Sequence, residues 1–106
     1  METENMDIKN VEDFNNIIRS SPTVLVDFFA TWCIPCKKQS VILDQARNDI
    51  KEEKIVKVDI EELEDLVEDL QIRSVPTLIL FKDGKEVWRE SRVLSKSEIL
   101  NKLGVS

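Results

Sequence analysis

The sequence predicts an α/β fold in which a central mixed β-sheet is flanked by helices on both faces. Segments rich in apolar and β-branched residues alternate along the chain with segments whose apolar residues recur at helical spacing. Residues 23–30 form a nearly continuous apolar run, which is typical of a central strand covered on both faces. The dipeptide Asp83-Gly84 is a strong hairpin signal, so the strands around it run antiparallel. Strands that alternate with helices and then end in a hairpin give a mixed sheet.

The first half of the chain supplies two helices and a central strand. Residues 1–6 are expected to form a frayed end or a short edge strand. Asn10 is a suitable N-cap for a first helix, which the Ser-Ser-Pro sequence at residues 20–22 ends. The inward side chains of that helix are expected to be Val11, Phe14, Ile17 and Ile18. The longer helix after the strand is expected to make its apolar contacts through Val41, Ile42, Ala46 and Ile50.

The second half supplies the remaining strands and two more helices. Residues 55–59 read as a second central strand, and residues 77–81 and 86–90 as the two strands of the hairpin. Residues 61–70 read as an acidic helix whose inward residues are Leu63, Leu66, Val67 and Leu70. Residues 95–98, Ser-Lys-Ser-Glu, form a capping box. The final helix is expected to carry Ile99, Leu100 and Leu103 as its apolar residues.

The composition limits the classes of function. A chain of 106 residues fits a single domain over residues 1–106. The net charge of −6 disfavours nucleic acid as a partner, because an acidic surface repels phosphates. No apolar run approaches the ~20 residues that a membrane helix requires, and the polar start of the chain lacks the pattern of a secretory signal. We expect a cytoplasmic protein that acts as a monomer and binds neither nucleic acid nor membranes.

The two cysteines, Cys33 and Cys36, lie where the buried strand ends and the long helix begins. Side chains three positions apart on a helical turn are roughly 5–6 Å apart, which suits a disulfide. The unpaired N–H groups and the dipole of the first turn favour a thiolate, so we expect the pKa of Cys33 to lie below its free value of ~8.5. Cys33 is expected to face solvent and to attack a substrate disulfide. The more enclosed Cys36 is expected to resolve the resulting mixed disulfide.

Four motifs resemble, in this order, those of the thioredoxin family. Residues 32–37 read Trp-Cys-Ile-Pro-Cys-Lys, where the family has Trp-Cys-Gly-Pro-Cys-Lys. Residues 26–30 resemble the strand before that motif, residues 75–77 the cis-proline loop, and residues 81–84 the late hairpin. The resemblance implies the thioredoxin fold and a dithiol–disulfide reductase of protein disulfides. It also implies that a flavin-containing, NADPH-dependent thioredoxin reductase recharges the Cys33–Cys36 disulfide, with no other cofactor.

Asp27 and Lys57 are candidate catalytic residues. Asp27 interrupts an apolar strand, where a carboxylate is costly to bury unless it is partnered or protonated. It is either a strand-end charge that reaches solvent or a functional acid. The resemblance places it beneath Cys36, whose proton it accepts, and places Lys57 beside it. The competing interpretation of Lys57 is an outward residue on an alternating strand.

The resemblance also implies a substrate-binding face around the cysteines. The resemblance implies that the peptide bond before Pro76 is cis. It also implies that the backbone of Val75 faces Cys33 and pairs with an extended substrate segment. The residues expected to form this face are Trp32, Ile34, Pro35, Val75, Pro76, Arg92 and Val93. Ile34 and Arg92 stand where the family has glycine, and both side chains are expected at the rim of the substrate groove. Trp88 is expected to pack within the hairpin.

Other classes of function are less consistent with these residues. An oxidase or isomerase of an oxidising compartment conflicts with the absence of a secretory signal pattern. A zinc site usually takes four Cys or His ligands, whereas this chain has two cysteines and no histidine, so we expect no metal. A non-enzymatic interaction module would not need either cysteine. A glutathione-dependent role fits poorly because Ile34-Pro35 differs from the Pro-Tyr pair of glutaredoxins.

Overall fold

The computed structural model describes residues 8–105, so the expected edge strand or frayed end at residues 1–6 lies outside the described residues. Within these residues, four strands form one sheet in the order β2-β1-β3-β4. Their bounds are β1 Thr23–Phe29, β2 Lys54–Asp59, β3 Thr77–Lys82 and β4 Lys85–Glu90. β1 pairs in parallel with β2 and antiparallel with β3, and β3 pairs antiparallel with β4. The expected mixed sheet is therefore confirmed.

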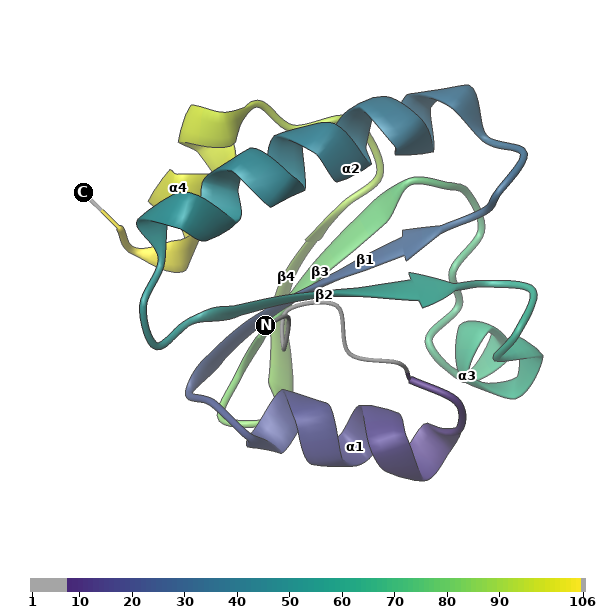
Figure 1. Ribbon diagram of the computed structural model, residues 1–106. Helices are drawn as coiled ribbons and strands as arrows, with labels where there is room; N and C mark the ends of the chain where they lie inside the picture. Colours follow the sequence, from purple (N-terminus) through teal and green to yellow (C-terminus); the bar gives the residue numbers. More distant parts are fainter. Residues whose placement is uncertain (1–7, 106) are drawn as a thin grey trace.

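In the described part of the chain, two helices cover each face of the sheet (Figure 1). The helices α2 (Ile34–Ala46) and α4 (Lys96–Leu103) lie over one face, and α1 (Val11–Arg19) and α3 (Glu64–Asp69) lie at the other. A 3₁₀ turn, η2 (Arg47–Asp49), extends α2. This arrangement is the thioredoxin fold that the motifs implied.

Alternation along β1 divides the core into two clusters, one on each face of the sheet. Val24, Val26 and Phe28 belong to the cluster that also holds Phe14 of α1. Leu25 belongs to the other cluster, which α2 and α4 complete. Because successive side chains in a strand point to opposite faces, Asp27 lies on the same face as Leu25. The acidic side chain is thus directed toward α2, the helix that carries Cys36.

The first helix is capped as expected, since the Asp13 N–H donates to the Asn10 side chain at 2.7 Å. Phe14 and Ile18 are buried and Ile17 is partly buried, but Val11 is exposed. The prediction that Val11 faces the core is therefore wrong. A residue at the first position of a helix lies at its end, where the sheet no longer covers it.

The inward face of α2 differs from the expected one. Its buried residues are Cys36, Gln39, Leu43 and Ala46, a spacing of three, four and three that keeps them on one side of the helix. Val41 falls on the opposite side and is 58% exposed, so its predicted core contact is wrong. Ile42 and Ile50 pack against the core as expected, although Ile50 follows η2 rather than lying within the helix.

The helix α3 is shorter than the predicted segment 61–70. The residues before it form a turn in which the Glu61 N–H donates to the Asp59 side chain at 2.9 Å, and the helix begins only at Glu64. Leu63 and Leu66 are buried, and Val67 and Leu70 are partly buried.

The hairpin and the final helix agree with the expectations. Asp83 and Gly84 adopt φ angles of +53° and +83°, the left-handed conformation that a tight hairpin turn needs. The register of β3 and β4 shifts between Leu80 and Phe81. Trp88 packs against the core beside α4. The capping box that starts α4 is present, with Ser95 and Glu98 bonding each other's backbone N–H groups.

Candidate active site

Cys33 and Cys36 form a disulfide whose Cα atoms are 5.3 Å apart, within the expected range. Cys33 is the N-cap of α2, and the Cys36 N–H points at the Cys33 sulfur, with the nitrogen 3.2 Å from it. Pro35, in the first turn, fits this position because a proline there lacks only an N–H that has no helical partner. When the disulfide is reduced, the N–H groups of the first turn stabilise a negative charge on Cys33.

Both sulfur-bearing residues are enclosed. Cys33 is 5% exposed and Cys36 is 2% exposed, and both pack with Ala30, Phe29 and Val75. The expectation that Cys33 faces solvent is therefore wrong for the disulfide form. The reason is that the side chain folds back over the helix start and closes against the loop at Val75.

The loop at Val75 and Pro76 lies against the disulfide. The peptide bond between these two residues is cis, as the resemblance implied. The Cys33 sulfur lies 3.8 Å from the carbonyl oxygen of Val75. Thr77 secures the loop, because its hydroxyl donates to the Ser74 carbonyl at 2.6 Å and lies 2.9 Å from the Ser91 hydroxyl. The backbone of Val75 is thus held at the sulfur.

Two apolar side chains beside the disulfide are open to solvent. Trp32 is 65% exposed and Ile34 is 77% exposed, so Trp32 is not a core aromatic. The Trp32 indole N–H donates to the Glu61 carboxylate at 3.1 Å, which fixes the ring over the loop after β2. Sequence reasoning missed Glu61, and no spacing signal connects it to Trp32 because the contact joins segments 29 residues apart.

Asp27 is fully buried, and neither of its carboxylate oxygens has a hydrogen-bond partner among residues 8–105. Burial raises its pKa from 3.8 to about 7, against the smaller lowering effects of Lys57 and Arg47. The interpretation of Asp27 as a charge that reaches solvent is therefore wrong. The acid and Cys36 both line one cavity of about 260 Å³, whose other lining residues include Ser40 and Lys57. This cavity connects the acid to the second cysteine.

Lys57 is the cross-strand partner of Asp27 in the parallel pairing of β1 and β2. Its ammonium group donates to the Ser40 hydroxyl and, at 3.1 Å, to the Asp44 carboxylate. Lys57 therefore neighbours Asp27, but its hydrogen bonds go to α2. Ser40 and Asp44 were not predicted, although their spacing from Cys36, four and eight residues, places all three on one side of the helix.

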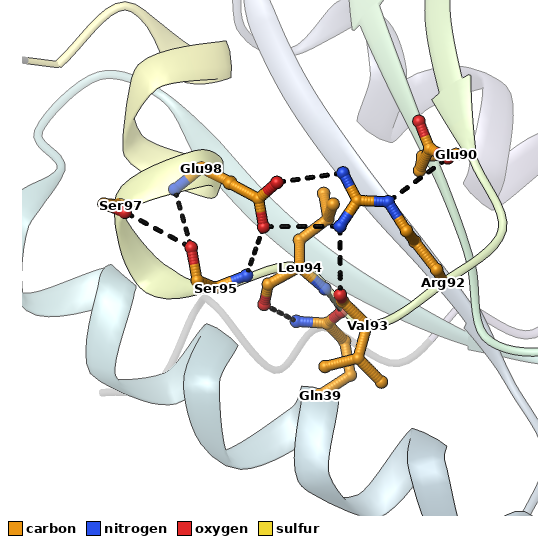
Figure 2. Close-up of polar contacts among 8 residues, drawn as sticks. All are labelled: Gln39, Glu90, Arg92, Val93, Leu94, Ser95, Ser97 and Glu98. Carbon is orange, nitrogen blue, oxygen red and sulfur yellow. Dashed lines mark hydrogen bonds and ion pairs between the residues drawn. The ribbon is translucent and has the colours of Figure 1, made fainter.

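Arg92 and Val93 lie in the segment between β4 and α4 (Figure 2). The Arg92 guanidinium contacts the Glu98 carboxylate at 2.9 Å and the Glu90 carboxylate at 3.4 Å. Hydrogen bonding from Arg92 is the main reason that the pKa of Glu98 falls to about 2. The positive charge is thus held between two acids. Whether Arg92 and Val93 meet a substrate stays a prediction.

Neither a metal-binding cluster nor a membrane-spanning helix occurs among the described residues. Within residues 8–105, no group of three or more His, Cys, Asp or Glu side chains could hold a metal ion. In the same range, no helix is long and apolar enough to cross a membrane.

The sequence of the chain is similar to those of known thioredoxins. The family model for thioredoxin matches residues 5–104 of the chain. The thioredoxin of Chlamydia trachomatis is 42% identical over 89 residues, which cover 84% of this chain and 86% of that protein. A thioredoxin-like protein of Synechocystis is 36% identical over 99 residues, which cover 92% of this chain and 94% of that protein.

Solved structures agree with this result. Plasmodium falciparum thioredoxin superposes with a TM-score of 0.83 at 28% identity, over 92% of this chain and 94% of that one. Mitochondrial thioredoxin 3 of Saccharomyces cerevisiae superposes with a TM-score of 0.86 at 25% identity, over 96% of this chain and 95% of that one. The chain belongs to the thioredoxin family, and the Cys33–Cys36 disulfide beside the cis-proline loop is the redox centre of a thiol–disulfide oxidoreductase.

Proposed function

We propose that this protein is a general reductase of protein disulfides, close to thioredoxin itself, with a Cys-Ile-Pro-Cys active site. The observation that carries the proposal is the buried acid Asp27, which shares a cavity with Cys36 while the Cys33 sulfur lies against the Val75 backbone. This arrangement gives the two cysteines different tasks. Cys33 lies beside the N–H groups of the first helical turn and the backbone of Val75, which is proposed to bind the substrate. Cys36 shares a cavity with Asp27, the proposed base.

The reaction begins with the reduced protein. The Cys33 thiolate attacks one sulfur of the target disulfide, which breaks that bond and releases the other target sulfur as a thiol after it takes a proton from water. Cys33 is then joined to the target by a mixed disulfide. The backbone of Val75 pairs with the extended target segment, and Trp32, Ile34 and Val93 give it apolar contacts.

The second step needs a proton acceptor. Cys36 gives its proton to Asp27 through the shared cavity and attacks the Cys33 sulfur. The Cys33–target bond breaks, the second target sulfur leaves as a thiolate that takes a proton from water, and the Cys33–Cys36 disulfide is restored. Two electrons have passed from the protein to the target. A carboxylate with a pKa of about 7 suits this role, because an acid near neutrality can both take and return a proton. Lys57 lowers the pKa of Asp27 and so favours the carboxylate form, which is the one that can accept the proton.

Reuse of the protein requires a reductant for its own disulfide. We propose a flavin-containing, NADPH-dependent thioredoxin reductase as that partner, because the family resemblance implies one. We also propose that the domain of residues 1–106 works as a monomer in the cytoplasm, where thiols are kept reduced.

The test is reduction of insulin disulfides, with dithiothreitol as the electron source. We expect turnover in the wild-type protein and none when Cys33 and Cys36 are both replaced by serine. The reduction potential, measured by equilibration with glutathione, should lie between about −200 and −290 mV. A potential near −120 mV would instead indicate an oxidase.

A further inference from the structure

Gln39 is a buried polar side chain that the proposed reaction does not use. It lies in α2 one turn after Cys36 and is 0% exposed, among positions of the helix that otherwise face the core. A buried amide is destabilising unless its donor and its acceptor are both satisfied. The contacts of Gln39 therefore indicate what holds it there.

Both polar atoms of Gln39 bond to the backbone of one residue, Leu94 (Figure 2). The Gln39 Nε2 group donates to the Leu94 carbonyl at 3.1 Å, and the Leu94 N–H donates to Gln39 Oε1 at 2.6 Å. Leu94 belongs to neither a strand nor a helix. The side chain of Gln39 thus supplies both hydrogen bonds that a neighbouring strand would give to this backbone.

The same segment is held from its outer side. Arg92 contacts Glu90 at the end of β4 and Glu98 in α4, and its guanidinium also donates to the Val93 carbonyl at 3.4 Å. These outer groups are exposed to water, whereas the pair of bonds from Gln39 is buried. The Leu94 side chain is also buried, in the core cluster that α2 and α4 complete. Since exposed ion pairs contribute little and buried hydrogen bonds more, the two bonds from Gln39 and the burial of Leu94 hold the segment against α2, and the bonds from Gln39 fix the Leu94 backbone directly.

We propose that Gln39 is a positioning residue for substrate binding, because it fastens the Val93–Leu94 backbone to the helix that carries the cysteines. Val93 then stands at a fixed distance from the reactive disulfide and forms a rigid wall for a bound protein segment. This inference rests on the proposed function in one respect, namely that Val93 belongs to the substrate-binding face. The chemistry at the sulfurs does not depend on the clamp.

The test compares a protein substrate with a small disulfide. Gln39→Met removes both hydrogen bonds and keeps a side chain of similar length. We expect its KM for insulin to rise about fivefold, which corresponds to about 1 kcal/mol of substrate binding lost when Val93 is no longer held in place, with kcat within twofold of wild type. The rate with 5,5′-dithiobis(2-nitrobenzoic acid), which is too small to need the wall, and the reduction potential should be unchanged.

A matched control separates positioning from stability. Ile18→Val trims a buried side chain on the opposite face of the sheet and touches neither Leu94 nor α2. It should lower the free energy of unfolding and leave the KM for insulin as in wild type. An unchanged KM in Gln39→Met, or a KM increase of equal size in Ile18→Val, would overturn the proposal.

A second measurement needs no variant. In the wild-type protein the amide hydrogen of Leu94 should exchange with solvent as slowly as those of β3, although it lies in a loop. Exchange at the rate of an open loop would overturn the proposal even if Gln39→Met did not fold. If wild type failed to reduce insulin, the proposed function would be lost, whereas slow exchange at Leu94 would still support the clamp.

Discussion

Replacement of the buried acid by a neutral amide, Asp27→Asn, should stabilise the protein in a pH-dependent way. The pKa of Asp27 is raised from 3.8 to about 7 by burial. The unfolded chain therefore releases the proton near pH 4, while the folded protein keeps it until pH 7. Burial of Asp27 therefore lowers the free energy of unfolding by an amount that depends on pH. This penalty is absent below pH 3.8, grows as the pH rises, and is complete above pH 7. With ~1.36 kcal/mol for each pKa unit, the full penalty is about 4 kcal/mol, and about 2 kcal/mol applies at pH 5.

The measurement is urea-induced unfolding of the oxidised wild-type and Asp27→Asn proteins at pH 5 and pH 8.5. The disulfide is kept intact so that the cysteines do not titrate. We expect the variant to be more stable by about 4 kcal/mol at pH 8.5 and by about half of that at pH 5. A difference that is the same at both pH values would refute the raised pKa. The same variant should resolve a mixed disulfide more slowly, because Cys36 loses its proton acceptor.

Three further predictions concern the other site residues. Limiting iodoacetamide near pH 7 should label Cys33 of the reduced protein first, and peptide mapping that found mainly Cys36 would reverse the two roles. Lys57→Met should raise the pKa of Asp27 further, since Lys57 lowers it. In that background the stabilisation by Asp27→Asn should still begin near pH 3.8 but should keep growing above pH 7, so urea-induced unfolding at pH 8.5 should show a larger gain than in the wild-type background. Arg92→Gly should slow reduction of an acidic disulfide substrate relative to a basic one at low salt, because it leaves two acids unpaired, and high salt should remove the difference. Equal selectivity in both proteins at low salt would exclude steering by Arg92.

The parts of the fold that local patterns determine could be predicted from the sequence. The apolar run of β1, the Asp83-Gly84 turn and the capping box at Ser95 each specify their own structure within a few residues. The position of Asp27 was also accessible, because a lone acid in a buried strand is conspicuous. The pairing of Cys33 with Cys36 followed from their spacing on one helical turn.

The inward face of α2 could not be read in the same way. A polar residue, Gln39, occupies a core position of this helix, and an apolar one, Val41, occupies an exposed position. These two residues conceal the helical periodicity, so the sequence pattern predicted that Val41 faces the core and did not identify Gln39 as a buried residue. Only the Leu94 backbone, which lies 55 residues away, makes a buried glutamine favourable there.

Contacts between distant segments escaped prediction for the same reason. The hydrogen bond from Trp32 to Glu61 and the ion pairs of Arg92 depend on how loops are folded against each other. The burial of Cys33 is a further case, since it depends on the approach of the Val75 loop.

One of the two edge strands among the described residues, β4, affects how the protein behaves at high concentration. A strand with an unpaired edge offers its free N–H and C=O groups to any other chain and so invites aggregation. In β4 four of the six residues are charged, and the register shift leaves Val87 without a partner in β3. Charges and irregular pairing both discourage edge-to-edge association. Among residues 8–105 no further strand pairs with β4, and its charges and irregular pairing keep its open edge from becoming a template for fibrils.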